Sequence, residues 1–405
     1  MKKCIIEMLN LQGMLVDKIE ISDKEEKVFV FCRSPKKTAI CPSCGKKSDK
    51  VHQTKVRLIR HDIISYRAVM LHLKYRRFKC RICKKVFTEE FTGIDRCRAS
   101  SHLMTEAMDW LRRNSFNFTS EQFKLSASTL TRYLLKMTDK IAIDWGKANV
   151  TKMGIDEHSF RGKRMVMTIT DISNHKLLAV LKSDSQKDLE EFLLGIPPEH
   201  REKIIEVCTD LRPSFGTVVK RIMPHAELVA DRFHVELLAR RAVDEIRSVV
   251  QEDAKGSRIN LKKLLWKNGC YLTENERIKL RKAFDKYENF PVLKQSWIIK
   301  EHILNLYFAH DEIEAERRFE RIMLLLESAD KSSYLPVLQR TLKKWKRPIL
   351  NYFKNKTTNG FTEGCHTKIK MIKRVSFGFR NINNYIAKIT LAFLPLIWIM
   401  NYHTC

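Results

Sequence analysis

Two stretches of the chain read as strands that carry an aspartate at or near the end: Lys152-Met153-Gly154-Ile155-Asp156-Glu157-His158 and Ile204-Ile205-Glu206-Val207-Cys208-Thr209-Asp210. A third stretch, Thr358-Asn359-Gly360-Phe361-Thr362-Glu363-Gly364, opens a strongly basic helix much later. Carboxylate oxygens suit Mg²⁺, and a pair of such ions can activate an attacking oxygen and stabilise a leaving one. Asp156, Asp210 and Glu363 in a basic protein therefore predict a phosphoryl-transfer site with two Mg²⁺ or Mn²⁺ ions that acts on DNA.

The sequence around these stretches alternates between strand and helix patterns. After the strand that carries Asp156, further strands are expected over 164–170 and 176–181, then a helix over 185–194 and the strand that ends at Asp210. Beyond it we expect a helix over 215–222, a strand over 226–230 and a helix over 235–250. A meander of three strands followed by alternating helices and strands is the order of a ribonuclease-H-like α/β domain.

This topology predicts which carboxylates can meet. The first and fourth strands of such a sheet are parallel neighbours, so Asp156 and Asp210 should approach each other. Asp171 follows the second strand, which runs antiparallel to the first, and should lie at the opposite edge. Asp231 closes the fifth strand at the same edge as Asp156. We expect Asp231 and His234 to support the metal ligands, and Asp231 is the main rival of Glu363 as the third ligand.

The helix that carries Glu363 has two distinct faces if it starts near Thr362. One face holds Glu363, Thr367, Lys370 and Arg374, that is, a carboxylate and two cations with a threonine between them. The other face should point to the core and holds Ile369, Ile372 and Val375. We expect Lys370, Arg374 and Lys368 to bind the DNA backbone beside the metal site. The alternative is a solvated basic helix whose first-turn glutamate is favoured by the helix dipole.

The charge of the chain is its most unusual bulk property. Its 405 residues contain 76 Lys and Arg against 47 Asp and Glu, which gives a formal net charge of +29. A hydrophobic content of 44% indicates a folded chain, long enough for two or three domains. Such a basic surface concentrates polyanions, so double-stranded DNA is the expected partner and a small-molecule substrate is not expected. Charge alone leaves open a ribosome-associated protein or a membrane-surface binder.

The sequence shows no targeting or membrane segment. The apolar stretch after Met1-Lys2-Lys3 is too short for a secretory signal. The apolar run over 390–400 contains Pro395, falls short of the about 18 residues that cross a bilayer, and is expected to be buried. Eleven cysteines without a signal indicate a reducing compartment. We therefore expect a cytoplasmic protein that makes no membrane contact.

Two Cys-x-x-Cys pairs near the N-terminus predict a zinc ribbon. They lie in Cys41-Pro42-Ser43-Cys44-Gly45 and Cys80-Arg81-Ile82-Cys83-Lys84, and four thiolates can hold one structural Zn²⁺. Strand-like alternation occurs at 27–32 and, between the pairs, at 69–75. The alternative is two coincidental surface pairs. The predicted zinc ligands are Cys41, Cys44, Cys80 and Cys83. These four residues complete the site, so the intervening His52, His61 and His72 are not predicted to bind the metal.

A helical pattern follows over 101–140. Met104, Met108 and Leu111 share one face, and a second face holds Leu130, Tyr133, Leu134 and Met137. Ser120 or Thr119 is expected to cap a short helix between them. The segment from Ser126 could begin a recognition helix of a helix-turn-helix, with Arg132 on DNA; an ordinary small helical bundle is the alternative.

Residues 251–350 have an almost wholly helical pattern that interrupts the α/β unit before its last helix. The predicted organisation has five parts: strands and zinc ribbon over 1–98, a helix-turn-helix-like DNA-binding region over 99–148, the first part of the catalytic core over 149–250, an all-helical insertion over 251–350, and the last core helices with Glu363 over 351–405.

Several blocks resemble those of ISL-three-type insertion-sequence transposases. They are Gly154-Ile155-Asp156-Glu157-His158-Ser159-Phe160, Ala230-Asp231-Arg232-Phe233-His234-Val235, Thr358-Asn359-Gly360 through Glu363 to Lys368-Ile369-Lys370, and Gly378-Phe379-Arg380-Asn381. The resemblance covers nearly the whole chain. It implies a zinc ribbon, a helix-turn-helix, a helical insertion before the last acidic residue, and Asp156, Asp210 and Glu363 as the family's DDE triad.

The resulting prediction is a DDE transposase that works as a homo-oligomer on DNA. Water would cut the phosphodiester at a transposon end, and the freed 3′-hydroxyl would attack target DNA without a covalent enzyme intermediate. The rival is a non-catalytic DNA-binding regulator derived from a transposase, which would not need three acidic residues beside DNA. A structure-selective nuclease is a third possibility, and the zinc ribbon counts against it.

Overall fold

The computed structural model describes residues 6–11, 13–94, 98–253, 260–330 and 334–395. Contacts divide the chain into two compact units. The first comprises Met1–Ala142 and Lys368–Cys405, and the second Ile143–Thr367. No helix within the described ranges is both long and apolar enough to cross a membrane.

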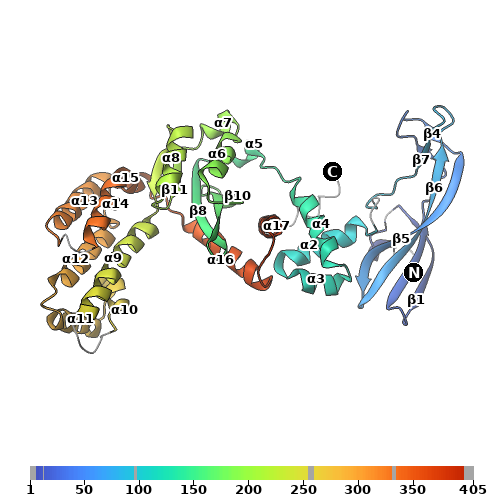
Figure 1. The fold of residues 1–405 in the computed structure, drawn as a ribbon. Coiled ribbons are helices and arrows are strands. Elements are labelled where there is room, and N and C mark those ends of the chain that lie inside the picture. The colour runs from blue at the N-terminus through green and yellow to red at the C-terminus, as the bar shows by residue number, and fades with distance from the viewer. Residues whose placement is uncertain (1–5, 12, 95–97, 254–259, 331–333, 396–405) are drawn as a thin grey trace. The chain divides into compact units, whose positions relative to one another are not determined.

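A twisted sheet forms the N-terminal part of the first unit. Its strands run in the order β1-β2-β6-β5, with β7 paired to β6 (Figure 1). The strands are β1 (Leu15–Ser22), β2 (Lys27–Arg33), β5 (Val51–Ile64), β6 (Arg67–Lys79) and β7 (Val86–Thr88). Apolar residues at every second position of β6, namely Val69, Leu71 and Leu73, are buried against Val30 and Ile59. The strand patterns predicted at 27–32 and 69–75 are confirmed.

The four cysteines of the predicted ribbon come together beside the short hairpin of β3 (Ala39–Ile40) and β4 (Lys47–Ser48). The Sγ atoms of Cys41 and Cys83 lie 3.6 Å apart, and those of Cys44 and Cys80 lie 3.5 Å apart. Four thiolates around Zn²⁺ at about 2.3 Å would lie about 3.8 Å from one another. Backbone amides, first that of Cys83, lower the pKa of Cys80 to about 6, whereas the pKa of Cys44 is raised to about 11, so without metal the four thiols share their protons unequally. The donor set fits Zn²⁺.

The intervening histidines take no part in this cluster. The ring of His61 bonds the Ser100 hydroxyl at 2.9 Å and the Leu9 carbonyl oxygen, and His72 stacks on Phe31.

Three helices follow in the first unit. They are α2 (Ser101–Arg113), α3 (Phe116–Phe123) and α4 (Ala127–Thr138), capped by the side chains of Ser100, Ser115 and Ser126. The predicted cap at Ser120 or Thr119 is wrong. The hydroxyl of Ser115 accepts the Phe118 N–H at 3.1 Å, and Thr119 lies buried inside the helix.

The predicted apolar faces of α2 and α4 are buried together with part of the C-terminal helix α17 (Ile382–Phe393). Met104, Met108, Leu111, Leu130, Leu134 and Met137 pack in one cluster with Ala387 and Leu391 of α17. Tyr133 is only partly buried. The prediction that the apolar run is buried holds only in part: Leu391 and Ala392 are buried, Thr390, Phe393 and Leu394 are partly buried, and Pro395 is exposed. Residues 396–400 lie outside the described ranges.

The second unit contains a five-stranded sheet in the order β10-β9-β8-β11-β12 (Figure 1). Its strands are β8 (Lys152–Arg161), β9 (Arg164–Asp171), β10 (Lys176–Leu181), β11 (Glu206–Thr209) and β12 (Glu227–Ala230). β8, β9 and β10 pair antiparallel, whereas β8, β11 and β12 pair parallel. The strands predicted at these positions and the parallel pairing of the first with the fourth are confirmed.

Helices connect these strands and then form a separate cluster. Those around the sheet are α5 (Trp145–Ala148), α6 (Gln186–Leu194), α7 (Pro198–Arg201), α8 (Pro213–Ile222) and α9 (Arg232–Asp253). The helices after α9 are α10 (Lys262–Trp266), the 3₁₀ turn η1 (Gly269–Tyr271), α11 (Glu274–Lys286), α12 (Pro291–Leu306), α13 (Glu312–Glu327), α14 (Leu335–Lys344), α15 (Lys346–Asn355) and α16 (Gly360–Val375). Helices α10 to α14 lie together at one end of this unit (Figure 1), as the helical pattern predicts.

We expect the purified protein to carry about one Zn²⁺ per chain in the cysteine cluster. Cys80→Ser should expel that ion, measured by elemental mass spectrometry, because three thiolates and a hydroxyl hold Zn²⁺ poorly. Cys270→Ser, the same change at an exposed cysteine, is the control and should keep the metal. A C80S protein with full zinc content would contradict the assignment.

Candidate active site

Parallel strands bring three aspartates to one edge of the second sheet. The register pairs Ile155 of β8 with Thr209 of β11, and Thr209 with Ala230 of β12. The residues that directly follow these paired positions are Asp156, Asp210 and Asp231. They therefore form a row across three adjacent strands, with Asp156 in the middle of β8 and with Asp210 and Asp231 directly after the last residues of β11 and β12. The backbone N–H of Asp231 donates to the Thr209 carbonyl oxygen at 2.8 Å and continues the ladder to the edge.

Helix α16 reaches this edge because Gly154 has no side chain. A Cβ at Gly154 would lie 2.5 Å from the hydroxyl of Thr362 and 2.6 Å from Oδ1 of Asn359. The Asn359 amide also donates to the Ile155 carbonyl oxygen at 3.1 Å, and the hydroxyls of Thr362 and Thr170 lie 2.7 Å apart. These contacts hold the start of α16 against β8. They therefore also determine the position of Glu363, which lies in the first turn of α16.

Helix α16 begins at Gly360, two residues before the start that the sequence indicates. The Asn359 carbonyl oxygen already accepts the Glu363 N–H at 2.9 Å, so the first helical turn forms around the contact with β8. This places Glu363 in the first turn, where the helix dipole favours a negative charge.

Glu363 joins Asp231 and His234 in a group whose ligand atoms all lie within 4.8 Å of one another. Burial, and then the negative charges of Asp210, Asp231 and Glu363, raise the pKa of Asp156 to about 7, and His234 opposes this shift. Burial, followed by Asp231, also raises the pKa of Glu363. Four carboxylates and one imidazole therefore share a confined space.

Two carboxylate oxygens in this space have no hydrogen-bond donor among the described residues. They are Oδ1 of Asp210 and Oδ2 of Asp231, both buried. Buried polar atoms are normally paired, because an unpaired one costs free energy. Unpaired carboxylate oxygens are the donors that Mg²⁺ and Mn²⁺ bind, so the residues fit divalent ions of this class.

Asp231 also has a structural role at the start of α16. Its Oδ1 accepts the backbone N–H of Asn359 at 2.9 Å, so only Oδ2 remains for a metal. The expected support of the metal ligands by Asp231 is consistent with this bond. Because Asp231 lies close to His234 and Glu363, it is still the rival of Glu363 as the third metal ligand.

His366 is a residue of this site that the sequence reasoning missed. Its Nδ1 lies 3.5 Å from Oδ2 of Asp156, and its Nε2 bonds the Thr168 hydroxyl at 3.0 Å. Thr168 in turn bonds Nδ1 of His158 at 3.0 Å. This chain orients the Asp156 carboxylate. The sequence could have indicated this residue, because His366 follows Glu363 by three residues and therefore lies on the same face of the helix.

Two other acidic residues of this sheet, Glu157 beside the site and Asp171 at the far edge, have different roles. Glu157 forms an ion pair with Arg212, which also binds Asp184 at 2.8 Å, so Glu157 points away from Asp156 as strand alternation predicts. Asp171 lies opposite Met153 and accepts the N–H of Asn174 at 3.0 Å in the following turn. Its predicted distance from the Asp156 edge is confirmed by this register.

The residues predicted to bind DNA are exposed. Lys368, Lys370 and Arg374 of α16 and Arg132 of α4 are all exposed, and the Lys368 amine also donates to the Ala392 carbonyl oxygen at 2.8 Å. On the opposite face of α16, Ile369 and Ile372 are buried as predicted. The prediction for Val375 is wrong, because it is 39% exposed at the last helical residue.

The comparisons with known proteins agree with these features. A family model for ISL3 transposases, described as "Transposase", matches residues 153–389. A second model, described as the zinc-finger of transposase IS204/IS1001/IS1096/IS1165, matches residues 37–83.

Curated relatives extend the match over nearly the full chain. The transposase for insertion sequence element IS1001 of Bordetella parapertussis is 24% identical over 398 residues, which cover 94% of this chain and 96% of the relative. The transposase for insertion sequence element IS1557 of Mycobacterium tuberculosis H37Rv is 25% identical over 277 residues, or 62% of this chain and 61% of the relative. With more than half of its length matched by the family model, the chain belongs to the ISL3 family of insertion-sequence transposases.

Proposed function

We propose that this transposase is a DDE enzyme that binds the terminal inverted repeats of its element, cuts the ends and joins the 3′-hydroxyl to target DNA by metal-dependent transesterification. The observation that carries the proposal is the row formed by the buried Asp156 and Asp231 and the partly buried Asp210 across β8, β11 and β12, to which α16 adds Glu363. The strand order β10-β9-β8-β11-β12 supports a ribonuclease-H-like catalytic core.

In this proposal Asp156, Asp210 and Glu363 would hold two divalent ions. The ions, when bound, supply an activated oxygen nucleophile and stabilise the leaving oxygen. The protein side chains form no covalent bond to DNA. Asp156 is oriented by His366, and Asp231 keeps the start of α16 in place through Asn359.

The reaction has two displacements at phosphorus. A water oxygen attacks the phosphodiester at the element end, and the bond to the 3′ oxygen breaks to leave a 3′-hydroxyl. That hydroxyl then attacks a phosphodiester of target DNA, and a new bond forms as a target 3′ oxygen leaves. The number of phosphodiester bonds is conserved in the second step, so it needs no external energy source.

DNA is the proposed partner of the exposed cations. Lys370 and Arg374 on α16 and Arg132 on α4 suit phosphate contacts, and most of the affinity should depend on salt. An element has two ends, and the described part of the chain offers one row of carboxylates of this kind, so we propose a homo-oligomer on DNA. Action on chromosomal DNA would place the protein in the bacterial cytoplasm, on the nucleoid.

A non-catalytic DNA-binding regulator is the alternative function. It would have no use for a cluster of carboxylates that repels DNA phosphates and in which burial, and then the neighbouring carboxylates, raise the pKa of Asp156 to about 7. A structure-selective nuclease would share the metal ligands, but would have no need of an end-recognition module such as the zinc ribbon.

Asp156→Asn separates the enzyme from the regulator. It preserves the shape of the side chain and removes a charge that holds metal, so end cleavage and strand transfer should be lost while end binding is kept or tightened. Cleavage with Mg²⁺ and binding with Ca²⁺ are measured on the same end duplex. Asp171→Asn, at the far edge of the same sheet, is the control and should still cut. Wild-type cleavage by D156N would refute the site.

A second comparison identifies the third ligand. Glu363→Gln should abolish cleavage as fully as Asp156→Asn, because loss of a direct ligand removes a metal position. Asp231→Asn should reduce the rate by about 10- to 100-fold, as is typical for a residue that supports metal ligands. An inactive D231N beside an active E363Q would instead assign the metal to Asp231 and His234.

Gly154→Ala tests how α16 is positioned. The new Cβ would meet the Thr362 hydroxyl at 2.5 Å and displace the first turn of α16, so cleavage should fall by about 100-fold. Gly364→Ala is the matched control, because a Cβ there meets nothing within 4 Å and alanine favours a helix. Cleavage rate and thermal melting are compared for both variants. Equal activity of G154A and G364A would contradict the positioning argument.

A further inference from the structure

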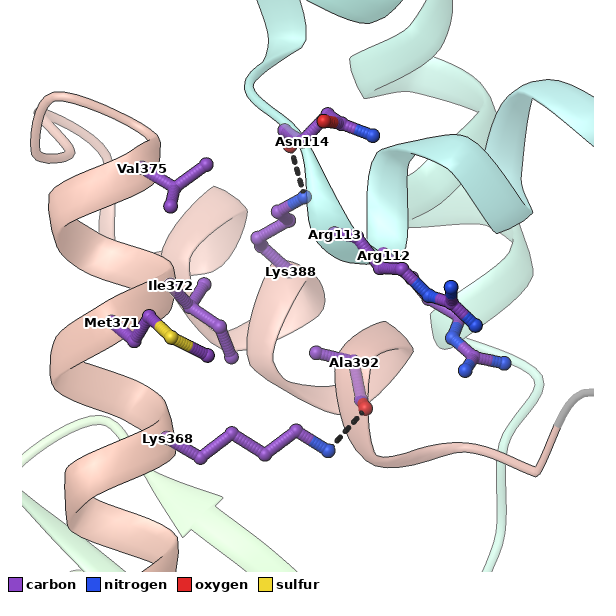
Figure 2. Close-up of a pocket in the computed structure, with 9 residues that line it drawn as sticks. All are labelled: Arg112, Arg113, Asn114, Lys368, Met371, Ile372, Val375, Lys388 and Ala392. Atoms are coloured by element: carbon purple, nitrogen blue, oxygen red, sulfur yellow. Dashed lines mark hydrogen bonds between the residues drawn. The ribbon is translucent and has the colours of Figure 1, made fainter.

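A cavity of about 320 Å³ lies in the first unit, between the end of α2 and the helices α16 and α17. Four of its lining residues are cations, and no carboxylate is among them: Arg112, Arg113, Lys368 and Lys388. Figure 2 shows Lys388 of α17 between the end of α2 and the wall formed by α16. The cavity is therefore suited to an anionic ligand.

Lys388 is the most unusual of these cations. Its side chain is 1% exposed, and its amine donates to the Asn114 carbonyl oxygen at 2.7 Å. The amine also lies 5.9 Å from the centre of the Phe116 ring. An ammonium group has three N–H donors, and the bond to Asn114 uses one of them. Burial lowers the pKa of Lys388 to about 7, and the other charged groups that line the cavity are cations on α2 and α16. An anion beside the amine would restore its charge.

The remaining wall of the cavity is apolar. It comprises Met371, Ile372 and Val375 of α16 and Ala392 of α17 (Figure 2). Met371 is 61% exposed, and its thioether is able to contact the face of an aromatic ring. An anionic ligand with a flat apolar portion would match both walls.

The size of the cavity limits the ligand. Small-molecule sites span roughly 300–1,000 Å³, so this cavity admits a single nucleotide but no part of an intact duplex. Enzymes that act on DNA can turn one nucleotide out of the base stack into a pocket, at a modest energetic cost. In a chain with a net charge of +29, DNA is the natural source of such a nucleotide.

We infer that this cavity binds one unstacked nucleotide of the DNA strand, with its phosphate beside Lys388 and Lys368 and its base against Met371. The inference rests on the proposed function, because it takes the element's DNA as the ligand. A purely structural role for Lys388, in which it only ties α17 to the end of α2 through Asn114, is the competing explanation.

The test places the fluorescent base 2-aminopurine at successive positions of the end duplex and measures binding with Ca²⁺, so that no cleavage is needed. Wild type should give a fluorescence rise at one position, where the base leaves the stack. Lys388→Met should lose that rise and bind about 10- to 100-fold more weakly, as expected for loss of a hydrogen bond to a charged group. Lys373→Met, which removes one charge from α16 outside the cavity lining, should keep the rise.

A second variant separates the ligand role from a structural one. Met371→Ala leaves the bond between Lys388 and Asn114 intact and removes an exposed side chain, so it should weaken the fluorescence rise without lowering the melting temperature. A full rise in K388M or in M371A would overturn the inference. So would an absence of any rise in wild type together with saturable binding of free deoxyadenosine monophosphate, which would assign the cavity to free nucleotides. Failure to cut bound ends would refute the proposed chemistry instead.

Discussion

The contact between the first turn of α16 and the backbone of β8 is the constraint on which the candidate active site depends. Asn359 and Thr362 fill the space that any side chain at position 154 would need. Because this contact fixes where the helix starts, it also fixes Glu363 close to Asp231 and His234. The glycine is therefore required by close packing of backbone and helix, since its φ angle is not in the left-handed region.

Electrostatic repulsion opposes this arrangement. Asp156 responds to burial and to three neighbouring carboxylates with a pKa of about 7, so the metal-free site retains a proton near neutral pH. The Asn359 N–H offsets part of the charge on Asp231, and His366 faces Asp156. In the proposed function, a divalent ion bound there would displace the remaining proton, so its binding would be coupled to proton release. The same crowding would favour the binding of cations.

Much of this could be predicted from the sequence, and the failures have physical causes. Strand periodicity and strand order were sufficient to place Asp156 and Asp210 on neighbouring parallel strands, because the side-chain period of a strand and the pairing of such sheets are strong constraints. The cap of α3 was misplaced because several hydroxyl residues compete locally, and only tertiary packing buries Thr119 inside the helix. Helix periodicity misassigned Val375, because the helix ends there.

The helical block between α9 and α16 shows how a carboxylate so distant in sequence can reach the sheet. Its last helix, α15, docks on the start of β12, where the Asn351 amide donates to the Leu228 carbonyl oxygen at 2.9 Å. The next residues, Asn355 and Thr357, bond Glu206 at the start of β11.

From there the chain follows β8 to Gly154, where Asn359 and Thr362 make their contacts and α16 begins. The position of Glu363 is thus set by the docking of α15 and by the segment after it. The entropic cost of closing a loop rises only slowly with its length, and the block has buried residues of its own, such as Leu280, Phe319 and Leu338. Insertion of many residues between β12 and α16 is therefore compatible with a precise site, provided that α15 keeps its contacts with the sheet.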